Sequence, residues 1–214
     1  MTAESGGSET DLKARLKVAG LTAFARIGYA RTSVDDVIEL ANTSRATFYR
    51  YFDNKQALFR ELSGECFRAM QALADRLAER PEEDPTAKVA AFLAGYENVH
   101  VRYGGVIRAW TENTWKENHG PDDRRLREEA DRAFVRLVDA FVGPIKAARI
   151  ASPLPPELRA AMLYVVVERS HFYIHSEYSS VDAGRLHRTL SVMVHRAFFG
   201  GDAHAVPRLR VGIR

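Results

Sequence analysis

The stretch that decides the fold of this chain runs from Thr32 to Leu58 and reads TSVDDVIELANTSRATFYRYFDNKQAL. It contains two short segments with apolar residues at helical spacing, and a polar Asn-Thr-Ser sequence lies between them. Asn42 opens that polar sequence, and asparagine is the next residue after glycine that tolerates a positive φ. The stretch therefore predicts two helices joined by a tight turn, as in a helix-turn-helix motif.

Capping residues predict where these helices begin. Thr32 or Ser33 begins the first helix, and an aspartate three residues later completes a capping box. Ser44 caps the second helix, and Asn54 caps the helix that follows, which carries apolar residues to about Glu79. The side chains of the second helix that are expected to pack inward are those of Ala46, Phe48 and Phe52.

Another helix is predicted before the motif. Apolar residues between Leu12 and Ile27 recur at the spacing of one helical face. Gly28 supplies a left-handed stop for this helix, and Tyr29 can fold back onto it. The first ten residues, 1–10, are rich in Ser, Gly and Glu, which predicts a flexible arm.

Composition places the chain among ordinary globular proteins. Its 214 residues can bury a sizeable core, and 46% hydrophobic with 28% charged residues is typical of soluble proteins. No run approaches the roughly 18 apolar residues that span a bilayer, and no secretory signal is visible, so we expect a cytoplasmic protein without membrane contact. Cys66 is the only cysteine, which excludes an intrachain disulfide and favours a buried, inert thiol over a redox sensor.

The pattern beyond Glu79 is again helical, with no alternating strand, so the sequence predicts an all-α fold. Gly104-Gly105 is expected to separate two helices, one over 86–103 and one through Trp110 and Trp115. The later helices are expected over 122–149, 156–179 and 182–199. The expected domains are a flexible arm (1–10), a helix-turn-helix domain (11–54), a connecting helix (55–80), a C-terminal helical domain (81–200) and a tail (201–214).

The helix capped by Ser44 has side chains that suit contact with DNA. The net charge of +3 is too small to indicate a nucleic-acid partner, so the placement of single side chains carries the argument. Arg45 lies in the leading turn, where its planar fork matches guanine O6 and N7. Ser44 and Tyr49 offer hydroxyls to phosphates, and Lys55 opens a helix whose dipole also favours a phosphate. Each residue alone also fits a solvated surface, but together with the turn they predict DNA binding.

Residues 12–59 resemble the DNA-binding domain of the TetR family of bacterial repressors, through the segments FARIGYARTSVDDVIELA, SRATFYRYF and NKQALF. The resemblance implies a homodimer that binds a pseudo-palindromic operator, with a C-terminal domain that senses a small molecule. Asn42 departs from the glycine that is usual in the family. By the same resemblance, the positions that contact phosphate hold Ser44, Thr47, Tyr49 and Lys55, and those that read bases hold Thr43 and Arg45.

The C-terminal domain is expected to hold its effector in a mainly apolar cavity with a few polar groups. The residues proposed to bind the effector are Tyr96, Tyr103, Ile107, Trp110, Thr111, Trp115, Phe141, Glu168, His171 and Phe172. Glu97 and Asn113 are further polar candidates, and core packing is the alternative for every one of these residues. The spacing around WTENTW and MLYVVVERSHFYIH resembles the subgroup of the family that accepts long hydrophobic ligands, which implies an apolar or aromatic effector.

One group of residues raises the question of a metal site. Glu168, His171 and His175 are spaced by three and four residues, which places them on one helical face within reach of a single ion. An ordinary polar helix face explains the same spacing, and the sequence contains no HExxH run. No metal and no cofactor is therefore predicted.

The last two long helices, over 156–179 and 182–199, carry more apolar residues than one face needs for the chain's own core. The residues of this surplus are Leu163, Val166, Val167, Ile174, Leu186, Leu190, Val194 and Phe198. Two such helices from each of two chains form a four-helix dimer interface, as the family resemblance also implies. An internal helical hairpin is the alternative.

These features predict a ligand-responsive transcriptional regulator that is not an enzyme: a repressor that a small hydrophobic effector releases from a palindromic operator. Two alternatives stay open. One is an activator, or a repressor that meets no small molecule. The other is a helical enzyme that uses His100, Glu168 or His171, but no serine elbow, phosphate loop or dinucleotide fingerprint supports it.

Overall fold

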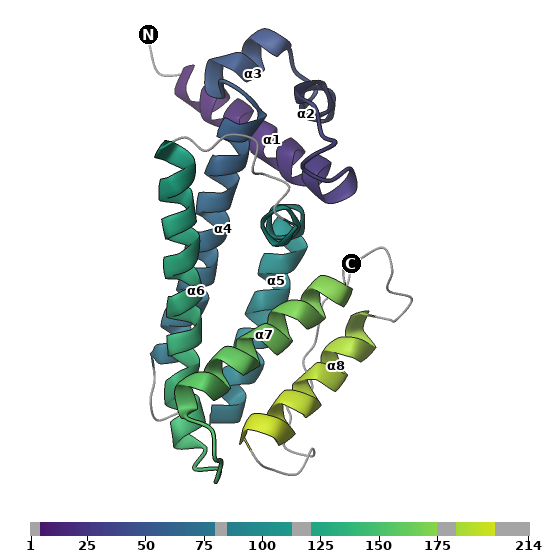
Figure 1. Ribbon diagram of the computed structural model, residues 1–214. Helices are drawn as coiled ribbons and strands as arrows, with labels where there is room; N and C mark the ends of the chain where they lie inside the picture. Colours follow the sequence, from purple (N-terminus) through teal and green to yellow (C-terminus); the bar gives the residue numbers. More distant parts are fainter. Residues whose placement is uncertain (1–4, 80–84, 113–120, 175–182, 200–214) are drawn as a thin grey trace. The chain divides into compact units, whose positions relative to one another are not determined.

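The computed structural model describes residues 5–79, 85–112, 121–174 and 183–199 (Figure 1). Its elements are α1 (Ser5–Arg26), α2 (Val34–Ala41), α3 (Arg45–Tyr51), α4 (Lys55–Ala78), α5 (Pro85–Thr111), α6 (Pro121–Ala147), α7 (Pro156–Ile174), α8 (Ala183–Val194) and the π-helix η1 (His195–Phe199). No strand occurs in these ranges, which confirms the all-α prediction. α1 begins inside the stretch expected to be a flexible arm. Within the part of the chain that is described, no helix is both long and apolar enough to cross a membrane.

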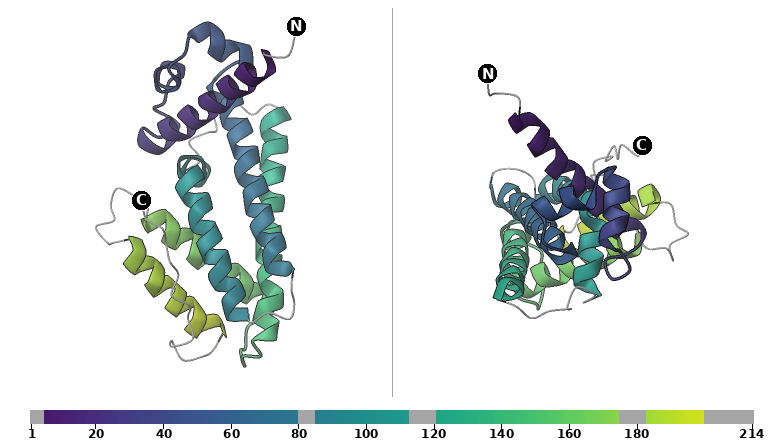
Figure 2. Two further views of the ribbon diagram at one scale, coloured as in Figure 1. Left: turned by 180° about the vertical axis from the view of Figure 1, so that it is seen from behind. Right: turned by 90° about the horizontal axis from the view of Figure 1, so that it is seen from above.

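The chain divides into two compact units. Unit 1 comprises Met1–Cys66 and Arg102–Glu129, and unit 2 comprises Phe67–Val101 and Ala130–Arg214. Because α4, α5 and α6 each cross a unit boundary, these three helices contribute residues to both units. Unit 1 contains the whole of α1, α2 and α3, which gather into one bundle (Figures 1 and 2).

An aromatic cluster fills the core of unit 1. Phe24, near the end of α1, meets Tyr29 edge to face with 5.3 Å between ring centroids. Phe59 of α4 lies 4.4 Å from Tyr29 and 5.9 Å from Phe24, and all three side chains are buried. Gly28, at φ 86°, turns the chain so that Tyr29 folds back, as predicted. Burial of each large apolar side chain stabilises the fold by roughly 1.5–3 kcal/mol, so this cluster fixes the end of α1 against α4.

One predicted helix boundary is wrong. The sequence predicts a break at Gly104-Gly105, but α5 continues through both glycines to Thr111. The reason is a close approach of two backbones within unit 1, where a Cβ atom on Gly105 would lie 2.4 Å from the carbonyl carbon of Phe24. Nη2 of Arg108 donates to the carbonyl oxygens of Phe24 and Ala25, at 3.2 and 2.7 Å, and so caps the end of α1. Gly105 therefore serves helix packing and does not interrupt the helix.

The core of unit 2 contains most of the residues that the sequence assigned to a dimer interface, which corrects that assignment. Five of them are buried within the chain itself: Leu163, Val167, Ile174, Leu190 and Val194. Here α7 and α8 lie side by side (Figures 1 and 2). Val166 is exposed, Phe198 is partly exposed, and the side chain of Leu186 lies outside the described residues. The apolar side chains that α7 leaves exposed are Val166, from the predicted set, and four others: Leu158, Met162, Val165 and Tyr173.

Cys66 on α4 is 1% exposed, as the sequence predicts for an inert thiol. Its burial raises the pKa of the thiol, because a buried thiolate loses the hydration that stabilises its charge. The sulfur therefore stays protonated and acts as a small apolar group of the core.

Replacement of Gly105 by Ala should destabilise the protein by about 1–3 kcal/mol, because the new methyl group meets backbone atoms of Phe24 and Ala25 that cannot rotate away. Gly95→Ala on the same helix is the matched control, since its Cβ would lie 2.4 Å from Cδ2 of Leu73, the end of a flexible side chain. Both variants gain the same helix propensity. Urea unfolding followed by circular dichroism measures the two losses, and equal losses would contradict the backbone contact at Gly105.

Candidate functional site

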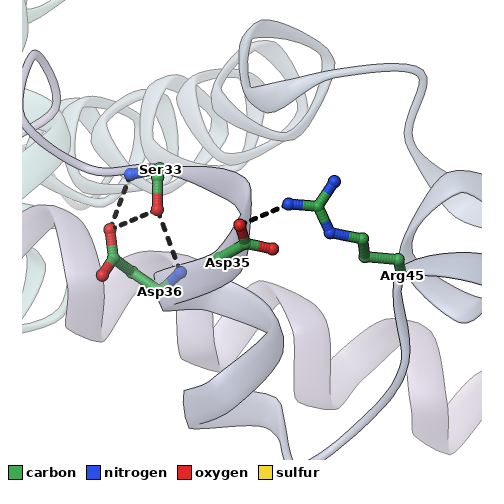
Figure 3. A network of polar contacts seen from close by, with 4 residues as sticks. All are labelled: Ser33, Asp35, Asp36 and Arg45. Atoms are coloured by element: carbon green, nitrogen blue, oxygen red, sulfur yellow. Dashed lines mark hydrogen bonds and ion pairs between the residues drawn. The ribbon is translucent and has the colours of Figure 1, made fainter.

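The first helix of the motif begins with the predicted capping box. The N–H of Ser33 donates to Oδ2 of Asp36 at 2.7 Å, and the N–H of Asp36 donates to Oγ of Ser33 at 3.2 Å (Figure 3). The Ser33 hydroxyl also donates to Asp36, at 2.7 Å. These bonds from the hydroxyl and the amide of Ser33 hold the pKa of the Asp36 carboxyl below its usual value. The start of α2 is thus fixed by two residues of its own sequence.

The turn between α2 and α3 is held from two sides. Asn42 adopts φ 47° and ψ 61°, the left-handed conformation predicted for it, and its N–H donates to the carbonyl oxygen of Glu39 at 3.0 Å. Nη2 of Arg15 on α1 donates to the carbonyl oxygens of Ala41 and Asn42, at 2.6 and 3.1 Å. A cation is stabilising there because the last carbonyls of a helix have no helical partners. The sequence did not reveal this role of Arg15, because its partners are main-chain atoms that no side-chain pattern marks.

The helix α3 has a buried side and an exposed side. Phe48 and Phe52 are 0% and 3% exposed, and their ring centroids lie 5.8 Å apart. Ala46, predicted to pack inward, is instead exposed, because it lies two positions before Phe48 and residues at that spacing do not share one side of a helix. The residues predicted to contact DNA remain accessible at its N-terminal end and outer side: Ser44, Arg45 and Tyr49 are exposed, and Thr43 and Thr47 are partly exposed.

Two of these residues also make contacts within the protein. Oγ of Ser44 accepts from the N–H of Thr47 at 3.2 Å, as predicted for an N-cap, and lies 3.0 Å from Oγ1 of Thr47. Nη2 of Arg45 donates to Oδ2 of Asp35 on α2 (Figure 3). The Arg45 and Asp35 side chains are 66% and 60% exposed, so this ion pair lies on the solvent-facing surface. A guanidinium has five N–H donors, so Arg45 keeps several for another partner.

Lys55, the first residue of α4, contacts the segment that joins α1 to α2. Its Nζ donates to the carbonyl oxygen of Tyr29 at 2.9 Å and lies 4.5 Å from the centroid of the Tyr29 ring. Part of its hydrogen-bonding capacity therefore orders this segment. Arg50 is a further exposed cation on α3, with its guanidinium 5.1 Å from the centroid of the Tyr51 ring. Arg50 was not predicted as a contact from the sequence, because it follows the leading turn of the helix.

The residues proposed to bind an effector are distributed over both units. Those in unit 1 are Tyr103, Ile107, Trp110 and Thr111, and those in unit 2 are Tyr96, Phe141, Glu168, His171 and Phe172. Trp115, Asn113 and His175 lie outside the described residues. In unit 1, Trp110 stacks on Phe59 with 6.4 Å between ring centroids, and its Nε1 donates to Oγ of Ser63 at 3.1 Å. Trp110 thus packs against α4 beside the aromatic core.

Unit 2 contains a buried polar cluster that consists of Tyr96, Glu97, His100 and His171. The Tyr96 and His171 rings meet edge to face at 5.0 Å, and the His100 ring lies 5.5 Å from Tyr96 and 5.6 Å from His171. All three rings are less than 5% exposed. Nε2 of His171 lies 3.3 Å from Oε2 of Glu97. Tyr96, Glu97 and His171 were predicted from the sequence for an effector site, whereas His100 was predicted only as a residue of the alternative enzyme.

Hydrogen bonding restricts the protonation of this polar cluster. Nδ1 of His171 lies 2.8 Å from the carbonyl oxygen of Val167, and because a carbonyl only accepts, Nδ1 carries a proton. A hydrogen bond between Nε2 and the Glu97 carboxyl then needs one further proton, on the imidazole or on the carboxyl. A protonated imidazole would form an ion pair with the Glu97 carboxylate at this distance. A single uncompensated charge at this buried place would be costly.

The remaining effector candidates of unit 2 divide into core and surface residues. Phe141 is buried and meets Phe92 edge to face at 4.7 Å, and Phe92 in turn stacks on Tyr96 at 5.8 Å. Glu168 and Phe172 lie nearer the surface of α7, where the Arg169 guanidinium is 5.1 Å from the centroid of the Phe172 ring. Among the residues that the structure describes, no three His, Cys, Asp or Glu side chains gather as metal ligands.

Comparison with known proteins agrees with the geometry of unit 1. Residues 18–62 match the family described as bacterial regulatory proteins, tetR family. The uncharacterized HTH-type transcriptional regulator YhgD of Bacillus subtilis (strain 168) is 35% identical over 90 residues. That match covers 42% of this chain and 41% of YhgD, so it spans less than half of the relative's length.

Solved structures share the fold over most of the chain. FadR from Bacillus subtilis, solved in complex with stearoyl-CoA, has a TM-score of 0.63 at 14% identity, over 89% of this chain and 100% of that chain. The MbdR regulator from Azoarcus sp. CIB has a TM-score of 0.69 at 13% identity, over 86% of this chain and 96% of that chain. Identity this low shows a common fold alone. Together with the matches of the N-terminal segment, it leads to one conclusion: the helix-turn-helix segment of this chain is that of the tetR family of bacterial regulatory proteins, on a fold shared with solved transcriptional regulators.

Proposed function

We propose that this protein is a repressor that binds a palindromic operator as a homodimer and is released by a small, mainly hydrophobic effector. The observation that carries the proposal is the two-sided character of α3. Phe48 and Phe52 bury its inner side, and hydroxyl and guanidinium groups occupy its exposed end. This function places the protein in the cytoplasm, with the DNA that it binds.

The proposed DNA contacts follow from the position and exposure of the side chains on α3 and next to it. A recognition helix inserts its N-terminal end into the major groove, so we assign Thr43 and Arg45 to base edges. The fork of Arg45 suits guanine O6 and N7. The remaining donors are assigned to phosphates: Ser44, Thr47, Tyr49 and Lys55. For Lys55 this contact competes with its bond to the Tyr29 carbonyl oxygen.

A second copy of the chain is the proposed partner of the exposed apolar side of α7. Leu158, Met162, Val165 and Tyr173 are 47–55% exposed, and their spacing places them on one side of the helix. Met193 of α8 is 57% exposed. Apolar side chains gathered in this way on a surface mark an interaction site. Pairing α7 and α8 with their copies makes a four-helix interface with two-fold symmetry, which suits recognition helices in two major grooves about 34 Å apart.

The proposed effector site lies in unit 2, beside the polar cluster. Phe92 and Phe141 supply apolar surface next to Tyr96, while Glu97 and His171 supply hydrogen-bonding groups for a polar end of the ligand. An elongated amphiphile matches such surroundings, since its apolar part gains from burial and its polar part meets buried partners. Stearoyl-CoA, which is bound in the FadR structure, is a compound of this class.

The helix α4 is the proposed connection between effector and DNA. It begins directly after the helix-turn-helix motif and ends in unit 2, so a shift of α4 on effector binding changes the placement of α3. A tenfold loss of operator affinity needs a coupling free energy of only about 1.4 kcal/mol. A small movement therefore suffices for release.

Tyr49→Phe and Arg45→Ala should weaken operator binding and leave the fold and the dimer intact. Loss of one phenolic donor should cost about threefold to tenfold in affinity. Loss of Arg45 should cost about tenfold in discrimination at one base pair of each half-site. Fluorescence anisotropy with a duplex that the wild-type protein selects from a random pool measures both. Arg125→Ala, which removes an exposed arginine from α6, is the control, and unchanged affinity in both test variants would contradict the assigned contacts.

Val165→Glu should convert the dimer into a monomer, because it places a carboxylate from each copy inside the apolar interface. The hydrodynamic mass should fall from about twice 24.0 kDa to 24.0 kDa at micromolar concentration. Val101→Glu is the matched control, since Val101 is 68% exposed on α5 and lies outside the apolar side of α7. A monomeric wild-type protein, or a dimeric Val165→Glu variant, would refute this interface.

Long-chain amphiphiles should stabilise unit 2 and release the operator, and His171→Phe should weaken their binding by about tenfold without abolishing DNA binding. A ligand at 100 times its dissociation constant raises the unfolding free energy by about 2.7 kcal/mol, which thermal unfolding detects. Stearate and stearoyl-CoA are suitable probes, and Val101→Glu, at an exposed position of α5 in unit 2, is the control. Equal responses of the wild type and His171→Phe would show that the polar cluster is not part of the effector site.

A reporter assay distinguishes a repressor from an activator. Lower expression of the regulated gene in the absence of the regulator would indicate an activator.

A further inference from the structure

We propose that Asp35 increases the DNA specificity of this regulator by holding the guanidinium of Arg45, an inference that rests on the proposed DNA binding through α3. Arg45 is the first residue of α3, and its Nη2 donates to Oδ2 of Asp35 in the first turn of α2 (Figure 3). Both side chains are mostly exposed, at 66% and 60%. The pair therefore belongs to the surface that would meet DNA and not to the core.

The capping of α2 does not require Asp35. The neighbouring Asp36 makes both reciprocal hydrogen bonds with Ser33, and Asp35 takes no part in them (Figure 3). A carboxylate near a duplex repels its phosphates and lowers affinity for DNA of any sequence. We therefore assign to the Asp35 carboxylate a role in how Arg45 binds DNA.

The ion pair limits what Arg45 can bind. An arginine without this partner has many rotamers and reaches phosphates of any sequence. With one Nη bonded to Asp35, the planar guanidinium is oriented, and its remaining N–H donors lie at a defined place. A guanine edge at that place is bound with the pair intact, whereas a phosphate elsewhere requires the pair to break. Asp35 thus acts as a positioning residue that disfavours non-operator DNA.

Asp35→Asn tests this role with two duplexes: one that the wild-type protein selects from a random pool, and one with the same composition in scrambled order. Affinity for the scrambled duplex should rise by about threefold to tenfold, because the released Arg45 gains a phosphate contact. The slope of log affinity against log salt should steepen by about 0.9 for each such contact. Affinity for the selected duplex should rise less, so the ratio of the two affinities should fall.

Two further variants distinguish the effect of the Asp35–Arg45 ion pair from the effect of removing a negative charge. Glu39→Gln removes the same charge from an exposed position on the same helix, and it should change both affinities by an equal factor. In an Arg45→Ala background, Asp35→Asn should leave the ratio unchanged, because Asp35 acts through Arg45.

The inference is overturned if Asp35→Asn and Glu39→Gln change the ratio of selected-duplex to scrambled-duplex affinity equally. It is also overturned if Asp35→Asn lowers this ratio as much in the Arg45→Ala background as in the wild-type protein. If Asp35→Asn lowers thermal stability but leaves the ratio of the two affinities unchanged, Asp35 only stabilises the N-terminus of α2 through the helix dipole, and the inference is overturned as well. If the wild-type protein selects no duplex at all, the proposed DNA binding itself fails, and the role of Asp35 fails with it.

Discussion

The placement of α3 depends on the burial of Phe48 and Phe52. A helix of seven residues is too short to be stable alone, so tertiary packing has to hold it. The two rings decide which side of α3 faces inward, while Arg15 and the left-handed Asn42 decide where the helix starts. The exposed hydroxyls and guanidinium of α3 are therefore a consequence of core packing, and the proposed contact with DNA follows from it.

Caps and turns were predictable because their interactions are local. Ser33 with Asp36, Asn42, and Ser44 with Thr47 each depend on atoms within four residues of the chain, where sequence spacing alone defines the geometry. The inward positions of Phe48 and Phe52 follow from the same local periodicity. The prediction for Ala46 was wrong because that periodicity places a residue two positions before Phe48 on a different side of the helix.

Features that depend on distant partners were not predictable. A glycine pair such as Gly104-Gly105 is compatible with a break or with close packing, and only the backbone of Phe24 decides between them. Leu163 and Val165 are equally apolar, so the pattern of α7 did not reveal which of them meets the core of its own chain. The same limit applies to the effector site. Aromatic composition grouped Trp110 with Tyr96, but Ser63 holds the indole of Trp110 in unit 1.

The covered sulfur of Cys66 restricts the kinds of signal that this chain can detect. Peroxides and electrophiles attack accessible thiolates, and the only thiol among the 214 residues is neither accessible nor ionised. Oxidation of Cys66 is therefore not a regulatory switch in the folded protein. The effector proposed above would act by reversible, noncovalent binding, so the response would follow the concentration of the effector at each moment and leave no covalent change on the sulfur.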